Sequence, residues 1–388
     1  MSIMKRALAL AVVVIGTLAG MFVGSRVMNS PMVSASPVVA YTAVRGHDAV
    51  LVAYERVGGQ IPVPFGRDDQ WQERVAAYSL DTGELLWDNK LHGHSRAARG
   101  VLAVADGKAY VATDFGLSIV DTETGEIVAD RDRIDGLGAD YAEAYAAYEV
   151  DPRLDAVVAL TRSGAVMQIP LGSIRAHNVP DAVAADWRDA LLDEWSVILG
   201  PTFSTSNVDP AGMPRTATLP DGSTFTFARP YNTERAQLMR DGNIVANITD
   251  LERAQIAYEI VRTPAPLASP EQRRERLDRT RHHSSAALLG VADGVALVYG
   301  DRSGQPGAEE LRLYDLDTGD VLATVDDFGG YVRATAAPKE RIVVIGAAED
   351  SGLDDDRLII FRADGRTTIT TVGDTDFWGR PRTSVATP

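Results

Sequence analysis

The chain has 388 residues, a formal net charge of -16 at pH 7 and no cysteine. The acidity disfavours nucleic acid and anionic lipid headgroups as general partners, and the lack of cysteine excludes disulfides, thiolate metal sites and a thiol nucleophile. Hydrophobic residues make up 45% and charged residues 24% of the chain, a globular composition with enough length for a large core or a ring of repeats.

An apolar segment follows Lys5 and Arg6 at the start of the chain. As a helix, residues 7–24 (ALALAVVVIGTLAGMFVG) would reach about 27 Å, just enough to span the apolar core of a bilayer. We therefore predict a signal anchor or signal peptide over residues 1–24. The uncleaved anchor is favoured because the small-residue site Val33-Ser34-Ala35 lies well beyond the apolar run. A buried core helix is the alternative.

This segment sets the expected location of the rest of the chain. The positive flank would stay in the cytoplasm, and the body of the protein would be exported. The predicted location is the cell envelope, either anchored by a single pass through the inner membrane or free after signal cleavage. Residues 25–37 are polar and contain proline, so a linker is expected there.

One hairpin pattern recurs along the chain. Residues 75–91 (VAAYSLDTGELLWDNKL) combine a strand, a tight turn at Asp81-Thr82-Gly83 and a second strand. Related patterns occupy residues 117–130 and 311–325, with a degenerate copy at 358–372. Thr82 and Thr124 stand about 42 residues apart, the length of a four-stranded propeller blade. We therefore predict an all-β fold, a single β-propeller over residues 38–372 with about seven blades.

The predicted elements follow the chain in four-stranded units. The first unit has strands at 38–44, 49–55, 74–80 and 85–89, the second at 101–105, 109–112, 117–121 and 127–129, and the third spans 144–177. The centre is less regular: strands at 224–228, 236–239, 243–247 and 255–261 are expected to form two degenerate units. The last two units cover 288–325 and 332–372.

Two helices are expected to interrupt the repeats. Val183, Trp187, Leu191 and Trp195 recur at helical spacing within residues 180–195. Residues 270–281 begin with a capping box and are charged nearly all round, which predicts a surface helix. In the tail, residues 373–388, Phe377 and Trp378 are expected to plug the channel or cover the closing blade.

Residues 78–87 (YSLDTGELLW) resemble the repeat of the pyrroloquinoline-quinone-like β-propellers. That repeat consists of a strand, an aliphatic-Asp pair, a Thr-Gly turn and an aliphatic strand ending in Trp. Ala129 and Thr324 stand near the Trp position in other copies. The resemblance covers about half of residues 38–372 and implies a propeller. It implies no single activity, because dehydrogenases, outer-membrane assembly lipoproteins and other envelope proteins share the repeat.

Catalytic and cofactor motifs are sparse. The resemblance to quinoprotein dehydrogenases implies a quinone, a calcium site and often adjacent cysteines, which this chain lacks. Residues 350–356 (DSGLDDD) are the best cation candidate, although a solvated acidic loop is favoured. The histidines His92, His94, His282 and His283 are better explained as polar loop residues than as metal ligands. No phosphate-binding loop or serine nucleophile elbow occurs, so no cofactor or metal site is predicted.

Long connections are expected on one face of the propeller. They are residues 92–100, 130–139 and 326–331, with 57–70, 301–308 and 348–356 beside them, whereas the opposite face has minimal turns. The predicted binding residues are His92, His94, Arg96, Arg99, Arg131, Arg133, Tyr331 and Arg333. A local arginine cluster suits a small anionic ligand or an acidic protein partner. Alternatively, these side chains pair with Asp130, Asp132, Asp326 and Asp327.

The combined prediction is an exported, membrane-tethered propeller that acts as a non-catalytic binding or scaffolding module through its loop-rich face. Two alternatives remain open. One is an enzyme, either a quinone-dependent dehydrogenase or a hydrolase, that uses the same face. The other is a structural subunit of a membrane complex, with the anchor helix as the contact.

Overall fold

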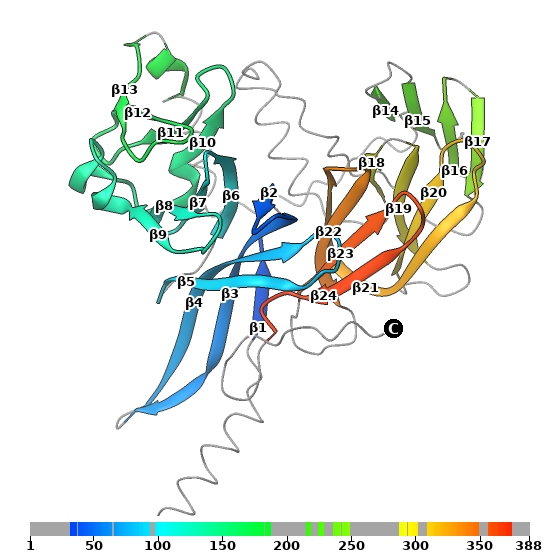
Figure 1. Ribbon diagram of the computed structural model, residues 1–388, viewed down its shortest axis with the longest axis horizontal. Helices are drawn as coiled ribbons and strands as arrows, with labels where there is room; N and C mark the ends of the chain where they lie inside the picture. Colours follow the sequence, from blue (N-terminus) through cyan, green and yellow to red (C-terminus); the bar gives the residue numbers. More distant parts are fainter. Residues whose placement is uncertain are drawn as a thin grey trace, which may run out of the picture.

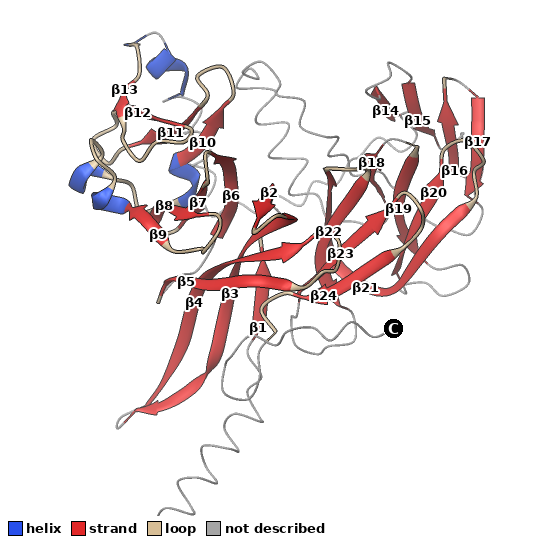
Figure 2. Cartoon of the chain, viewed as in Figure 1, coloured by secondary structure: helices blue, strands red, loops and turns tan. Residues whose placement is uncertain are grey.

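The computed structural model describes residues 32–36, 38–63, 66–93, 98–181, 183–187, 215–218, 224–228, 236–241, 243–248, 287–292, 294–301, 309–348 and 356–374. Within these ranges the chain consists of antiparallel strands with a few short helical turns. Figures 1 and 2 show the sheets placed next to one another along an arc. The predicted all-β class is confirmed, and the arrangement is consistent with a propeller.

The first sheet has five strands: β1 (Met32–Ala35), β2 (Ala40–Val44), β3 (His47–Val63), β4 (Gly66–Ser79) and β5 (Leu85–His92). β1 and β2 pair one after the other with the same edge of β3. The prediction of a linker over residues 25–37 is therefore wrong at β1, because Val33 is 3% exposed and packs into the core of the first sheet.

The predicted open connection at residues 57–70 is also wrong. Its described residues extend β3 and β4 into a long hairpin, in which Val63 is the last residue of β3 to pair, opposite Gly66 (Figure 1). The β-branched residues Val57, Ile61 and Val63 favour extended backbone, and the pairing satisfies backbone groups that a loop would leave to water.

Three further sheets have four strands each. The second sheet contains β6 (Ala98–Ala105), β7 (Lys108–Thr113), β8 (Gly116–Asp121) and β9 (Ile127–Asp130). The third sheet contains β10 (Tyr148–Asp151), β11 (Ala156–Leu160), β12 (Val166–Pro170) and β13 (His177–Asn178). The fourth sheet contains β14 (Arg215–Thr218), β15 (Thr224–Ala228), β16 (Ala236–Arg240) and β17 (Asn243–Ile248). The strands predicted near β15, β16 and β17 are confirmed. They share one sheet with β14, which the sequence did not predict. The division of this region into two units stays a prediction, because the strand at 255–261 lies outside the described residues.

The last sheet has seven strands: β18 (Ala287–Ala292), β19 (Val295–Asp301), β20 (Glu309–Asp315), β21 (Val321–Ala337), β22 (Arg341–Ala348), β23 (Asp356–Arg362) and β24 (Thr367–Thr371). It comprises two four-stranded units that share β21. The predicted connection at residues 326–331 is wrong, because β21 runs through it and Phe328 pairs with both β20 and β22. The predicted count of seven blades stays a prediction, since residues 188–214 and 249–286 lie outside the described ranges.

Few of the helix predictions fall on described residues. Asp181 and residues 183–187 are helical, as predicted for 180–195. Trp187 is 3% exposed there, and its indole N–H donates to a carboxylate oxygen of Asp151 at 2.9 Å. Among the described residues, no helix has the length and apolar character to cross a membrane. Residues 1–31, the helix at 270–281, the strand at 255–261, and Phe377 and Trp378 lie outside the described residues.

Apolar side chains fill the interfaces between neighbouring sheets. Leu51 and Val75 of the first sheet are fully buried together with Val111 of the second. Tyr54 points to the other side of the first sheet and is buried with Ile360 of the last. The first sheet therefore packs between the second and the last, which brings the two ends of the described chain together.

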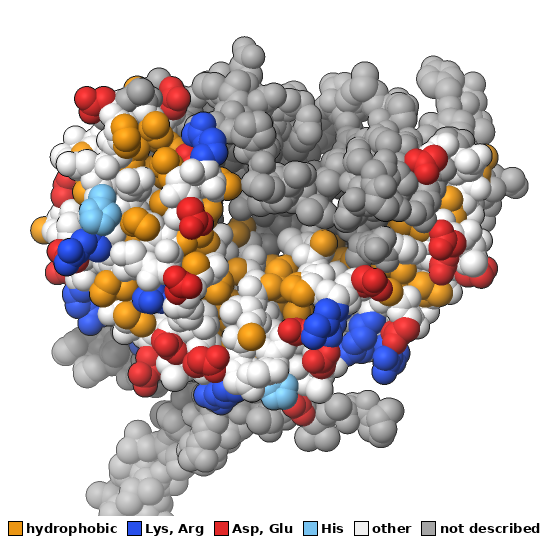
Figure 3. Space-filling model, turned by 45° about the horizontal axis from the view of Figure 1, so that its top comes forward, with side chains coloured by type: hydrophobic (Ala, Val, Ile, Leu, Met, Phe, Trp, Pro, Cys, Tyr) orange, Lys and Arg blue, Asp and Glu red, His pale blue; other side chains and the backbone are white. Residues whose placement is uncertain are grey.

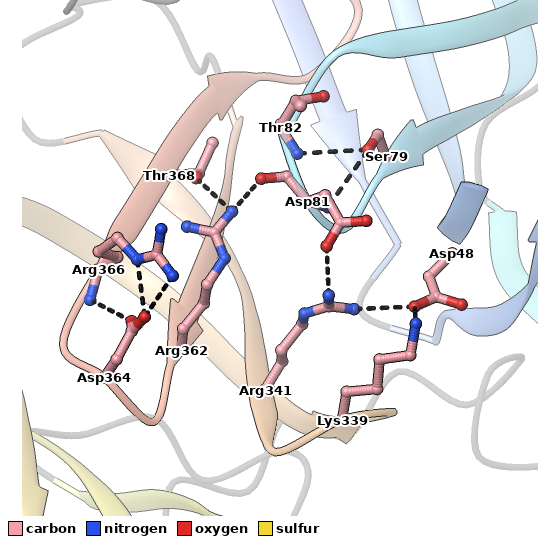
Figure 4. A network of polar contacts seen from close by, with 10 residues as sticks. All are labelled: Asp48, Ser79, Asp81, Thr82, Lys339, Arg341, Arg362, Asp364, Arg366 and Thr368. Atoms are coloured by element: carbon pink, nitrogen blue, oxygen red, sulfur yellow. Dashed lines mark hydrogen bonds and ion pairs between the residues drawn. The ribbon is translucent and has the colours of Figure 1, made fainter.

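Ion pairs reinforce the contact between the first and last sheets (Figure 4). The side chain of Arg341 on β22 is 8% exposed and donates to the carboxylates of Asp48, at 3.3 Å, and of Asp81. Lys339 lies 2.5 Å from Asp48, and its hydrogen bond is the main reason that the pKa of Asp48 is lowered. Arg362 of β23 donates to the backbone oxygen of Asp81. Complementary charges thus connect sheets that are distant in sequence.

The Thr-Gly turns of the repeat also lie at sheet interfaces. Gly125 has a φ of +73°, and a Cβ atom on it would lie 2.5 Å from the ring of Trp87 in the preceding sheet. The indole N–H of Trp87 donates to the backbone oxygen of Thr122 at 2.9 Å. Gly83 has the same φ, and there Thr368 and Thr370 of β24 occupy the place of Trp87. The turn needs glycine both for its backbone and for the neighbouring strand that packs on it.

Candidate functional site

The two ends of the strands differ in their connections. At one end, tight turns such as Asp106-Gly107 and Thr82-Gly83 join the strands. The other end has the tight β7–β8 turn and the end of the β3–β4 hairpin, but it also carries the long β9–β10 connection, residues 131–147 with three 3-10 turns, and we refer to it as the loop-bearing face. On the face seen in Figure 3, the acidic and basic side chains of the described residues are interspersed, with no large field of one sign. A charged partner would therefore meet local groups of charges on this face.

His92 lies at the loop-bearing face, between the first and second sheets. It ends β5, and its Nε2 atom lies 3.1 Å from the hydroxyl of Ser118 on β8. Its ring also packs against Phe115, with 5.2 Å between ring centroids. Burial, followed by the positive charge of Arg131, lowers the pKa of His92 to about 4, so the imidazole is neutral at pH 7.

Arg131 and Arg133 come directly after β9, on a 3-10 turn that spans Arg131–Arg133. Arg133 donates to Asp130 at 2.5 Å, and a guanidinium nitrogen of Arg131 lies 3.5 Å from the same carboxylate. Burial by itself raises the pKa of Asp130, but the hydrogen bond and charge of Arg133, with the charge of Arg131, outweigh burial and leave that pKa lowered. Asp130 is therefore ionised near neutral pH.

This arginine pair retains exposed hydrogen-bond donors. The side chain of Arg133 is 63% exposed and that of Arg131 36% exposed, whereas the Asp130 side chain is 4% exposed. The sequence analysis gave pairing with Asp130 as the alternative interpretation of these arginines. Both arginines do form ion pairs with Asp130 in the structure. A guanidinium has five N–H donors, so one buried carboxylate leaves others available to an anionic group outside. Arg131 also has a φ of +47°, an uncommon backbone conformation for a residue with a side chain.

Three carboxyl groups that the sequence analysis missed lie beside His92. Glu73 on β4 pairs in register with His92 on one side and Glu55 of β3 on the other. Glu73 is fully buried. Burial, followed by the charge of Asp114, raises the pKa of Glu55 to about 7. Burial likewise raises the pKa of Asp114, on the β7–β8 turn, against a lowering backbone hydrogen bond at Tyr145.

A sequence signal for these carboxyls existed. Leu51, Ala53 and Glu55 alternate along β3, so a carboxylate continues a series of fully buried apolar positions. A charged residue at a core position of a strand is uncommon and points to a special environment.

The structure places His92 near Arg131 and Arg133, whose charges act on it. Arg99 lies on β6 and Tyr331 and Arg333 on β21, but their side chains are outside the described part of the chain, as are His94 and Arg96 altogether. Within the described ranges, no group of three or more histidine or acidic residues is arranged to hold a metal ion. Of the predicted cation loop, Asp356 begins β23, and residues 350–355 are not described.

The contact between His92 and Ser118 does not form a catalytic nucleophile. Ser118 is fully buried, so no substrate carbonyl could reach its hydroxyl. The low pKa of His92 also makes the imidazole a weak base. The contact joins β5 of the first sheet to β8 of the second.

No protein-family model and no curated protein matches this chain. Several solved structures are similar at low identity. A eukaryotic initiation factor is 10% identical with a TM-score of 0.23, and the match covers 87% of this chain and 54% of the initiation factor. This chain therefore spans about half of the length of the initiation factor. Dihydro-heme d1 dehydrogenase is 12% identical with a TM-score of 0.27, over 87% of this chain and 74% of that one. Quinohemoprotein alcohol dehydrogenase from Comamonas testosteroni is 10% identical with a TM-score of 0.21, over 88% and 69%. Such low values carry no inference about activity.

Proposed function

We propose that this chain is an exported, membrane-tethered β-propeller that binds an anionic ligand or an acidic protein segment through its loop-bearing face and does not catalyse a reaction. The observation that carries the proposal is the grouping of Arg131 and Arg133 around Asp130, with most of the Arg133 side chain exposed. Exposed guanidinium groups held by a buried carboxylate are preorganised to receive a carboxylate or phosphate.

The position of the group adds support. It lies where the second sheet passes into the third, at the end of the molecule that carries the irregular connections. Loops supported by a rigid sheet are common places for binding residues. The neutral His92 beneath the arginines adds no charge that would compete with theirs.

The test measures binding of inorganic phosphate and of a hexaglutamate peptide to the full-length protein by isothermal titration calorimetry at low salt. Arg133→Ala and Arg131→Ala should weaken binding about tenfold or more, because a charge-assisted hydrogen bond contributes about 1.5–3 kcal/mol. Arg366→Ala is the matched control, since Arg366 forms a similar exposed pair with Asp364 on the opposite face. Equal weakening by all three variants, or no binding of either probe, would contradict the proposal.

The tether and the absence of catalysis need separate measurements. Mass spectrometry of protein purified from membranes should find an intact terminus at Met1 or Ser2, whereas a new terminus near Ser36 would indicate a free exported protein. No bound quinone and no calcium-dependent rise in Tm are expected. Either finding would favour a quinone-dependent dehydrogenase instead.

A further inference from the structure

A row of polar side chains crosses the end of the first sheet at the loop-bearing face. Glu55, Glu73 and His92 are paired in register on β3, β4 and β5. His92 then contacts Ser118 of β8 in the second sheet. Side chains of directly paired residues point to the same face of a sheet, so the two glutamates face the second sheet.

This row replaces an apolar interface. Leu51 and Ala53 precede Glu55 on the same face of β3, and Val75 follows Glu73 on β4; all three apolar residues are fully buried against the second sheet. An apolar residue at the position of Glu55 would continue this packing. A carboxyl group at that position has to be protonated, paired with a cation or hydrated, and each of these states changes how closely the two sheets approach.

One carboxylate oxygen of Glu55 lacks a hydrogen bond from the part of the chain that the structure describes. Its Oε1 atom is buried, and within the described residues no hydrogen-bond donor reaches it. Asp114 of the second sheet lies at the same end of the interface, because Phe115, the next residue, packs its ring on His92 of the row, and its charge acts on Glu55. On its own sheet the opposite residue is Glu73, a third carboxyl.

Among the described residues, the positive charges that neighbour this row point elsewhere. Arg56 and Arg74 neighbour the two glutamates in sequence but alternate to the other face, where Arg74 pairs with Asp88 at 2.9 Å. Arg131 and Arg133 lie beyond the neutral His92 and pair with Asp130. The described surroundings of Glu55 therefore favour its uncharged form.

We propose that Glu55 and Asp114 form a proton-binding site between the first and second sheets. With a proton bound, the sheets pack closely at the loop-bearing face. When the proton leaves to solvent, the two carboxylates repel each other and admit water, which loosens this end of the interface. The proposal does not depend on what the loop-bearing face binds.

The direction of the pH effect follows from the two states of Glu55. Burial and the charge of Asp114 raise the pKa of Glu55 from 4.5 to about 7. The folded protein therefore holds this proton more tightly than the unfolded chain does. The stabilisation is complete below about pH 4.5 and is lost as the pH rises through about 7.

The experiment follows the Tm of the full-length protein from pH 4 to 7.5 in the wild type and in Glu55→Gln, which resembles the protonated carboxyl. The two proteins should differ little near pH 4, and the variant should become progressively more stable than the wild type as the pH rises to about 7. Glu126→Gln, at an exposed glutamate, is the control and should leave the pH dependence unchanged. A constant difference in Tm between Glu55→Gln and the wild type across this range would overturn the proposal.

A second measurement covers the case in which Glu55→Gln does not fold. Infrared difference spectra of the wild type should contain a protonated carboxyl band that disappears with a midpoint near pH 7, far above that of an ordinary glutamate. Asp114→Asn removes the repelling charge and should move this midpoint to lower pH. Absence of the band, or an unchanged midpoint in Asp114→Asn, would refute the assignment. Hydrogen exchange at pH 8.5 should also be faster around residues 114–118 in the wild type than in Glu55→Gln.

Discussion

Gly83 provides a direct test of how the first and last sheets meet. It has a φ of +73°, and a Cβ atom there would lie 2.5 Å from the methyl group of Thr368 and 2.6 Å from the hydroxyl of Thr370. Gly46 has a φ of +81° and nothing within 4 Å of the same atom. Replacing each glycine by alanine therefore imposes the same backbone strain, but only at Gly83 does the new methyl group collide with the neighbouring sheet.

The expected magnitudes follow from these distances. An L-residue in the left-handed region costs about 1–2 kcal/mol, which is the whole effect expected for Gly46→Ala. At Gly83 the crowded methyl adds about 1–3 kcal/mol. It also disturbs the hydrogen bond from Thr370 to the backbone oxygen of Gly83, 3.0 Å long and worth about 1 kcal/mol. Gly83→Ala should thus destabilise the protein by about 3–6 kcal/mol.

Urea unfolding followed by tryptophan fluorescence, with calorimetry for Tm, measures both variants. Thr368→Ala removes the nearest methyl group, so Gly83→Ala should cost about 1 kcal/mol less in that background, a coupling that a double-mutant cycle detects. Equal destabilisation by Gly83→Ala and Gly46→Ala, with no coupling to Thr368, would show that β24 does not pack on this turn. The closure of the first sheet against the last would then be wrong.

Three further predictions concern the sheet interfaces. Trp87→Phe keeps most of the ring but leaves the buried carbonyl of Thr122 without its donor, so it should cost about 1–3 kcal/mol in urea unfolding. Arg341→Met should destabilise by about 1–2 kcal/mol, because it removes a buried guanidinium from the carboxylates of Asp48 and Asp81, which are 27% and 52% exposed, and Asp48 keeps its contact with Lys339. Lys339→Met, at a side chain 69% exposed, should cost less than about 1 kcal/mol by the same assay. The pKa of His92 is lowered to about 4, so its stabilisation is present above about pH 6.5 and lost as the pH falls through 4; His92→Gln should lose less stability than the wild type between pH 7 and 4.5 in urea titrations.

Much of the fold could be predicted because its signals are local. The Asp81-Thr82-Gly83 turn and its copies combine a left-handed glycine with alternating apolar residues, and such patterns determine hairpins without reference to the rest of the chain. Pairing between less regular strands depends on tertiary context. This is why β14 was missed and why residues 57–70 were predicted as a loop.

Part of the candidate site could likewise be predicted from the sequence, and part depends on tertiary packing. Arg131 and Arg133 could be identified because they follow a strand end directly and stand next to Asp130 in the sequence. The carboxyls of Glu55 and Asp114 lie on different sheets, and only the packing of one sheet against the other brings them together. A sequence pattern shows that Glu55 continues the core-facing side of β3, but it does not show which charge lies opposite.

The two interfaces of the first sheet place their charges in opposite ways. Toward the last sheet, Arg341 lies between Asp48 and Asp81, so ionisation strengthens a contact that closes the molecule. Toward the second sheet, at the loop-bearing face, Glu55 and Asp114 are of like charge, so ionisation weakens the contact. Because ionisation strengthens one interface of the first sheet and weakens the other, a change in pH should reach the arginines beside the second sheet and leave the contact with the last sheet unaffected. Binding of the hexaglutamate peptide, whose carboxyls stay ionised between pH 6 and 8, should therefore depend on pH near 7. Glu55→Gln should remove that dependence without changing the effect of Arg341→Met on stability.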